Sequence, residues 1–183
     1  MKFTFTVLFC FLLSMVQAQT KTYPNIDIPF KKFVLDNGLT LIVHEDPKLP
    51  IAAFNIWYHV GSKNEKPGKT GFAHLFEHIM FTSTEHWSNF DEVMQTVGGG
   101  NNNGTTNNDR TNYFETFTSS GLDRVLWVEA DRMGFLLKGL DSNKVNVQRG
   151  VVQNEKREGD NQPYAVAEEL TVKATYPVGH PYS

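Results

Sequence analysis

The chain has 183 residues, a formal net charge of −3 and 40% hydrophobic residues. This length favours one domain, and the hydrophobic content, which includes 14 Phe, is sufficient for a core rich in aromatic rings. The small negative charge gives no indication of a nucleic-acid partner, because proteins that bind nucleic acids usually carry a basic surface.

Residues 1–18 have the pattern of a secretory signal peptide. A short positive segment precedes an apolar stretch from Phe3 to Val16, and Val16-Gln17-Ala18 suits cleavage by signal peptidase. The stretch is short for a membrane span, and an uncleaved anchor is the alternative interpretation. We therefore expect a secreted or periplasmic protein with no stable membrane insertion after cleavage. Because Cys10 is the only cysteine, the mature chain is expected to have no disulfide.

The next segments predict an extended leader followed by three strands. Residues 19–32 are polar, contain two prolines and are expected to be extended. Asp36-Asn37-Gly38 lies between apolar runs and predicts a tight hairpin over residues 33–44. Residues 51–60 are rich in β-branched and aromatic side chains, which predicts a third, well-buried strand.

A predicted helix from Thr70 to Phe81 contains the most informative motif of the chain, His74-Leu75-Phe76-Glu77-His78. On a helix, residues i and i+4 lie on one face, so both imidazoles can bind one tetrahedral zinc ion with Glu77 nearby. The motif inverts the His-Glu-x-x-His order of other zinc proteases. Histidines one turn apart also occur by chance, but the apolar neighbours predict a largely buried helix. Buried polar side chains must be paired or bind a metal.

Catalytic zinc takes three protein ligands, so the motif needs a third. Residues 141–158 begin with an aspartate cap and are predicted to form a helix, on which Glu155 and Glu158 are candidates. Spacing alone does not choose between them, and both could be solvated surface residues.

The other segments predict helices with one loop and one strand between them. An amphipathic stripe predicts a helix over residues 89–97, and residues 101–108, rich in Asn, Gly and Thr, are predicted to form a loop. A strand over 111–118 and helices over 121–138 and 165–174 follow. Strands, hairpins and helices in this order favour an α+β fold in which an antiparallel sheet packs against helices.

Several short segments recur in the same order in one known family. They are residues 35–40 (LDNGLT), 71–78 (GFAHLFEH), 98–99 (GG), 109–113 (DRTNY), 149–155 (RGVVQNE) and 180–182 (HPY). From about Phe33 onward the chain resembles the N-terminal domain of the pitrilysin-like zinc metallopeptidases, the inverzincin group of mitochondrial processing peptidase and insulin-degrading enzyme. The resemblance implies that fold for residues 33–183. It also implies a zinc-dependent metalloendopeptidase that hydrolyses extended peptides or unfolded proteins.

The resemblance implies that His74, His78 and Glu155 bind one zinc ion and that Glu77 is the general base. Many family members carry a further Glu two helical turns before the third ligand, where this chain has Gln148.

The resemblance also implies a substrate-binding element after the glycine run. Asn103 and Thr106 would contact the peptide substrate, with Gly104 in the place of the family's alanine, and the strand that follows would pair with an extended peptide. A plain polar turn is the alternative. Asp109 would orient a ligand histidine, although a role in capping the loop fits its position as well.

The family completes its site with an Arg/Tyr pair from a second, related domain, which holds the oxyanion. Because this chain ends within the first domain, we expect a truncated chain that needs a second pitrilysin-like domain or subunit. The isolated chain is expected to bind zinc and to show weak or no peptidase activity.

Two alternatives compete with the peptidase interpretation. S-ribosylhomocysteine lyase also uses His-x-x-Glu-His, but its chemistry requires cysteines, which the mature chain lacks. A non-catalytic zinc-binding or assembly subunit of a two-part protease is the second alternative. Such subunits typically lose a metal ligand or the base, whereas all four positions are filled here.

Overall fold

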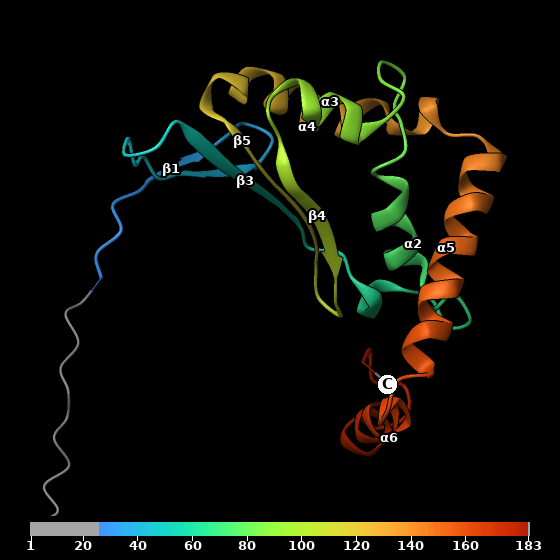
Figure 1. Cartoon of the computed structure of the whole chain (residues 1–183). Coiled ribbons are helices and arrows are strands. Elements are labelled where there is room, and N and C mark those ends of the chain that lie inside the picture. Colours follow the sequence, from blue (N-terminus) through green and yellow to red (C-terminus); the bar gives the residue numbers. More distant parts are fainter. Residues whose placement is uncertain (1–25, 183) are drawn as a thin grey trace, which may run out of the picture. The chain divides into compact units, whose positions relative to one another are not determined.

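The computed structural model describes residues 26–182. The chain divides into two units, and the boundary along the sequence lies between Pro47 and Lys48. Figure 1 shows the elements in chain order. The predicted signal peptide and residues 19–25 of the predicted leader lie outside the described residues.

The first unit contains one antiparallel hairpin, as predicted. Strand β1 (Lys31–Val34) pairs with β2 (Thr40–Val43). Gly38 has a φ of 86°, which glycine adopts without steric cost, and the Asn37 side chain accepts a hydrogen bond from the Leu39 amide. The predicted leader is two residues too long, because Lys31 and Lys32 already belong to β1.

The second unit is built on a three-stranded antiparallel sheet with the order β3-β5-β4. These strands are β3 (Ile51–Tyr58), β4 (Gly100–Thr106) and β5 (Thr111–Thr118). The predicted loop over residues 101–108 is therefore wrong, since most of it is β4. Asn and Gly disfavour strands, but pairing with β5 and a register shift between Gly100 and Asn103 accommodate them.

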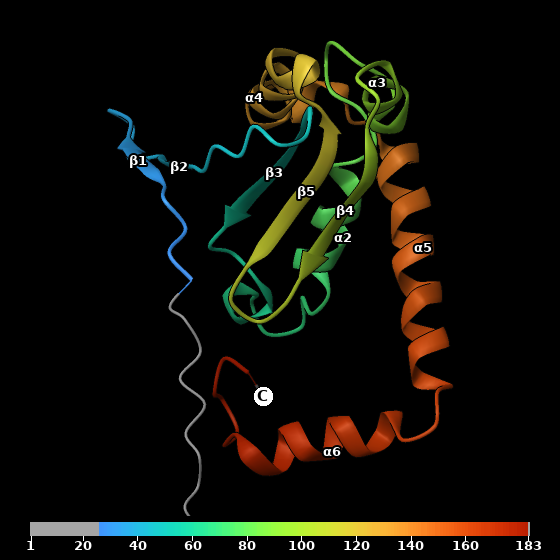
Figure 2. The same ribbon diagram turned by 60° about the vertical axis from the view of Figure 1, so that its left-hand side comes forward.

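Five α-helices accompany this sheet: α2 (Phe72–Ile79), α3 (Phe90–Thr96), α4 (Leu122–Gly139), α5 (Ser142–Asp160) and α6 (Ala165–Thr175). Two short 3-10 turns, η1 (Ser62–Asn64) and η2 (Ser119–Gly121), complete the described elements. Figure 2 shows α5 alongside α2, with α6 turning away from the far end of α5. The fold is α+β, as predicted. Among the described residues, no helix combines the length and apolar character that a membrane crossing requires.

Two clusters of buried side chains hold the helices against the sheet. One joins Phe117 of β5 to residues of α3 and α4, including Phe90 and Val128. The other joins Ile56 and Tyr113 of the sheet to the end of α2 and to α4, and its remaining buried members are Ile79, Met80 and Leu136. The second cluster places α2 over the sheet, and this sets the position of the histidine motif.

A buried charge cluster lies between the sheet and α4. Arg132 has no exposed side-chain surface, and its Nη2 atom lies 2.5 Å from Glu129 Oε1 and 3.4 Å from Glu115 Oε1. The guanidinium also lies over the Tyr113 ring, 4.3 Å from its centroid. Burial and the nearby charge of Glu129 raise the pKa of Glu115 to about 8. Glu115 therefore keeps its proton to a higher pH than an exposed glutamate does.

Candidate metal centre

Glu65 fixes the beginning of α2. Its Oε2 atom accepts a hydrogen bond from the Gly71 amide at 3.0 Å, and its Oε1 atom accepts one from the Ala73 amide at 2.7 Å. Amides at the start of a helix have no partner within the helix, and a carboxylate there also interacts favourably with the helix dipole. Glu65 therefore acts as the cap of the motif helix, a role that spacing in the sequence did not reveal.

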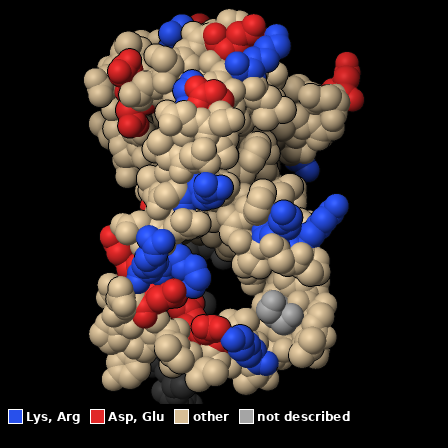
Figure 3. All heavy atoms as spheres, turned by 90° about the vertical axis from the view of Figure 1, so that its right-hand side faces the viewer, with Lys and Arg blue, Asp and Glu red and all other residues tan. Residues whose placement is uncertain are grey.

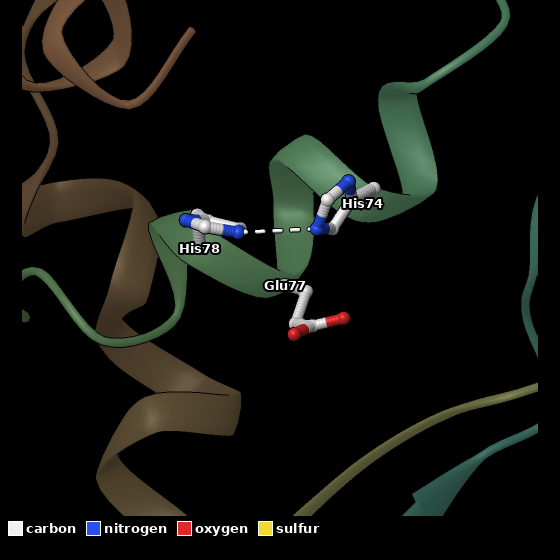
Figure 4. A group of neighbouring side chains, drawn as sticks. All are labelled: His74, Glu77 and His78. Carbon is white, nitrogen blue, oxygen red and sulfur yellow. Dashed lines mark hydrogen bonds between the residues drawn. The ribbon is translucent and has the colours of Figure 1, made fainter. Parts of the chain in front are cut away.

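The two motif histidines lie one turn apart on the same face of α2, as predicted. Figure 4 shows their imidazoles facing each other, with the Glu77 carboxylate beside them. The His74 and His78 Nε2 atoms are 3.2 Å apart. The opposite face of the helix supplies Ile79 to the core, so burial of that face presents the histidines to the adjoining helix α5.

Glu155 of α5 completes a triangle with these two nitrogens. Its Oε2 atom lies 3.4 Å from His74 Nε2 and 3.3 Å from His78 Nε2. Two ligand atoms each bonded to a tetrahedral zinc at about 2.0–2.1 Å lie about 3.3–3.4 Å apart. Two imidazoles and one carboxylate are also a zinc-binding donor set. The residues present therefore fit a zinc ion.

Of the two candidate acids on α5, the structure brings Glu155 to the histidines. Glu158 is exposed and accepts a hydrogen bond from Asn154 at 3.0 Å, on the same helix. The ambiguity that spacing left open is thus resolved by the rotation of α5 about its own axis.

Lys144 anchors the beginning of α5 to the segment that follows α2. Its Nζ atom donates to Ser83 Oγ at 2.9 Å and to the Gly139 carbonyl at 2.7 Å. A Cβ atom at Gly139 would lie 2.3 Å from the Thr84 backbone, so this close approach requires glycine. These contacts set the position of α5 along α2 and hence the place of Glu155.

Glu77 lies in the same group of side chains and is buried, with 8% of its surface exposed. One possible ligand atom from each of His74, Glu77 and His78 lies within 4.8 Å of the others. Glu155 is nevertheless the better third ligand, because its Oε2 atom lies 3.3–3.4 Å from both Nε2 atoms, while Glu77 Oε2 accepts a hydrogen bond from Thr106 Oγ1 at 2.5 Å. The arrangement leaves Glu77 as a carboxylate beside the three candidate ligands.

A hollow of about 420 Å³ opens beside these residues. Asn103 and Asn102 of β4 line it together with Asp91, Phe81 and the four motif-site residues His74, Glu77, His78 and Glu155. Asn103 thus lies at the site, as the predicted substrate role requires, and its Oδ1 atom accepts a hydrogen bond from the amide of Gly104.

Thr106 and Asp109 were predicted to contact substrate and a ligand histidine, respectively, and the structure gives both side chains other partners. The hydroxyl of Thr106 donates its hydrogen bond to Glu77 Oε2. Asp109 accepts hydrogen bonds from Lys63 Nζ and the Tyr182 hydroxyl, both at 2.6 Å, which lower its pKa. Neither partner of Asp109 is a histidine, and these contacts instead tie the turn between β4 and β5 to η1 and to the segment after α6.

The strand predicted to pair with substrate is also different. The prediction assigned this role to the strand over residues 111–118, but β5 is the central strand and pairs on both sides. Within the described sheet, β3 and β4 are the two edge strands, and β4 is the one whose residues line the site, so it offers unpaired backbone groups there.

The face of the molecule on the α5 side carries interspersed acidic and basic side chains (Figure 3). Two exposed ion pairs of the helices α5 and α6 link residues four apart, Lys156 with Asp160 on α5 and Lys173 with Glu169 on α6. Exposed pairs of this kind contribute little to stability.

Comparison with known proteins places this geometry in a family. The model of the insulinase family, peptidase family M16, matches residues 40–181. The zinc protease PqqE of Helicobacter pylori is 35% identical over 152 residues, which are 81% of this chain and 33% of that protein. An uncharacterized zinc protease of Bacillus subtilis, YmxG, is 28% identical over 148 residues, 80% of this chain and 36% of that protein.

A solved structure agrees with these relatives. The crystal structure of a protease from Helicobacter pylori is similar with a TM-score of 0.73 and 32% identity, over 84% of this chain and 37% of that one. The chain spans about a third of the length of the curated relatives it matches. The family match over most of the chain shows that this protein belongs to the insulinase family, peptidase family M16, the pitrilysin-like group predicted from its motifs.

Proposed function

We propose that this chain carries the zinc-binding half of a metalloendopeptidase site. His74, His78 and Glu155 would hold the ion, and the observation that carries the proposal is the triangle of their ligand atoms, with sides of 3.2–3.4 Å. When bound, zinc lowers the pKa of a coordinated water and polarises the scissile carbonyl.

Glu77 would be the general base. It takes a proton from the attacking water through its carboxylate and delivers that proton to the leaving amine. Its burial supports this role, because a carboxylate shielded from bulk water keeps its orientation and its interactions are less screened.

The substrate would be an extended peptide or an unfolded protein. The free edge of β4 offers backbone hydrogen-bonding groups beside the metal centre, and an extended peptide can add to such an edge as a further strand. Asn103, which lines the hollow, would hold the peptide near the histidines.

Full activity would need a second pitrilysin-like domain or subunit that supplies the groups for the oxyanion. This dependence rests on the resemblance of the chain's motifs to the pitrilysin-like peptidases, whose oxyanion groups come from a second, related domain. We expect the isolated chain to bind zinc and to be a far weaker peptidase than the two-domain assembly. The sequence of residues 1–18 supports a secreted or periplasmic location.

Metal analysis of purified variants tests the proposal. The parent chain and Glu77→Gln should each retain about one zinc per chain, whereas His74→Ala should retain almost none. His59→Ala is the matched control, because His59 is exposed and lies outside the triangle, and it should keep the parent zinc content. Equal, negligible zinc in the parent and in His74→Ala would refute the metal centre.

Peptide hydrolysis then separates an enzyme from a non-catalytic zinc-binding subunit. Glu77→Gln should lose the chelator-sensitive hydrolysis of an unstructured peptide while it keeps zinc. If Glu77→Gln hydrolysed the peptide at the parent rate, its role as the base would be excluded.

A further inference from the structure

Thr106 contacts the proposed base directly. The distance from its Oγ1 atom to Glu77 Oε2 is 2.5 Å, and Glu77 itself is buried. An ionised carboxylate has no hydrogen to give, so Thr106 is the donor of this hydrogen bond. Hydrogen bonds to an ionised acceptor are roughly twice as strong as neutral ones.

The neighbouring strand keeps the Thr106 hydroxyl available for this bond. Thr111 lies opposite Thr106 in the sheet, with 3.2 Å between their Oγ1 atoms. The hydroxyl hydrogen of Thr111 is directed to the Val60 carbonyl at 2.9 Å. Because Thr111 can use its own hydrogen for this bond, Thr106 can donate its hydrogen to Glu77.

The backbone of β4 confines the same carboxylate from a second direction. A Cβ atom at Gly104 would lie 3.0 Å from Glu77 Cγ and 3.2 Å from Glu77 Oε1. Even a methyl group at this position would therefore crowd the Glu77 side chain, and glycine leaves the carboxylate just enough room. One oxygen of Glu77 is bound by Thr106, and no residue between 26 and 182 forms a hydrogen bond with the other, Oε1.

We propose that Thr106 is a positioning residue for the general base. Its hydroxyl holds Oε2, and this directs Oε1 to receive the proton of the attacking water. The inference rests on the proposed role of Glu77. It gives Thr106 a function different from the substrate contact expected from the sequence, since the hydrogen that a substrate carbonyl would need is already donated.

The first test measures the contact itself and requires no zinc. The protein carries 13C at its glutamate side-chain carboxyl carbons, and the Glu77 resonance is assigned by its loss in Glu77→Gln. Thr106→Val removes the hydroxyl at nearly constant shape and should shift this resonance, whereas Thr106→Ser should return it to the parent position. Thr105→Val is the matched control, because Thr105 donates to Asn112 on the other face of the strand and should leave the resonance in place.

The second test measures the consequence for the reaction. The zinc-loaded chain, in excess over a quenched fluorescent peptide, is followed in single turnover. Thr106→Val should lower the limiting rate constant about tenfold to a hundredfold, as expected for a misplaced catalytic group. The chain concentration for half-maximal rate and the zinc affinity should stay near the parent values, and Thr106→Ser should recover most of the rate.

Two results would overturn the proposal. One is an unmoved Glu77 resonance in Thr106→Val, or an equal movement in Thr105→Val. The other is a Thr106→Val rate equal to a measurable, chelator-sensitive parent rate, or a loss in that variant that Thr106→Ser does not recover. A parent chain without zinc would instead refute the proposed function, and the resonance measurement would still decide whether Thr106 holds Glu77.

Discussion

The Oε2 atom of Glu155 lies 3.3 Å from the Nε2 atom of His78, although the two residues belong to helices separated by the whole of α3, β4, β5 and α4. Helix α2 supplies two nitrogens, and α5 supplies the oxygen that closes the set. The proposed metal centre therefore depends on the relative position of two helices as much as on the motif itself.

Replacement of the third ligand should lower zinc affinity strongly. Residues that only orient a ligand typically contribute tenfold to a hundredfold to metal affinity, so we expect a loss above about a hundredfold for Glu155→Gln. Competition with a chromogenic chelator measures the affinity. Glu158→Gln, three residues further on the same helix, should bind zinc like the parent chain, and a comparable loss in both variants would contradict the assignment.

Loss of the Glu65 cap should destabilise the fold. Glu65→Ala leaves the Gly71 and Ala73 amides without their acceptor, and a lost cap costs about 0.5–2 kcal/mol. Urea unfolding followed by circular dichroism measures this change. Glu85→Ala, which removes an exposed pair with Lys138, serves as the control and should cost less than about 1 kcal/mol.

Truncation of the buried arginine should be among the most damaging changes in the second unit. Arg132→Met leaves Glu129 buried without its cation, and breaking a buried pair in this way costs about 3–5 kcal/mol. Arg124→Met, on the exposed face of α4, tests whether the loss is specific, and it should change the unfolding free energy only slightly. A small effect of Arg132→Met would show that water reaches the cluster.

The buried carboxyl of Glu115 should make stability depend on pH. Its pKa is about 8 in the folded chain and about 4.5 in the unfolded chain, so the folded state holds the extra proton between these values. With respect to this group, stability should therefore be highest below pH 4.5, should fall as pH rises between 4.5 and about 8, and should change no further above that range.

Unfolding free energies measured between pH 5.5 and pH 8.5 check this dependence. Glu115→Gln keeps a neutral side chain at every pH and should flatten the profile. An unchanged slope in Glu115→Gln would assign the pH dependence to other groups.

The motif helix and most elements could be predicted from the sequence because their signals are local. The spacing of His74 and His78 predicts a shared helical face, and the Asn-Gly turn predicts the hairpin of the first unit. Both predictions are confirmed. They could be made from sequence because neither feature depends on contacts with distant segments.

The contacts across the site could not be predicted in this way. Strand β4 has an unfavourable composition, and it forms because β5 pairs with it. The bond between Thr106 and Glu77 depends on the register of that pairing and on how α2 crosses the strand. Gly104 and Thr106 lie on one face of β4 because they are two residues apart on a strand. This relationship does not follow from the sequence when residues 101–108 are taken as a loop.

Because α5 is largely exposed, a bound metal would also help to hold this helix in place. No residue of this helix is buried, and Lys144 fastens only its first turn. A bound ion would cross-link the middle of α5 to α2 and would add its binding energy to the stability of the folded state. Where zinc is scarce, α5 would lose this cross-link and should be cut more readily by other proteases, so the supply of the metal would influence the lifetime of the polypeptide as well as its chemistry.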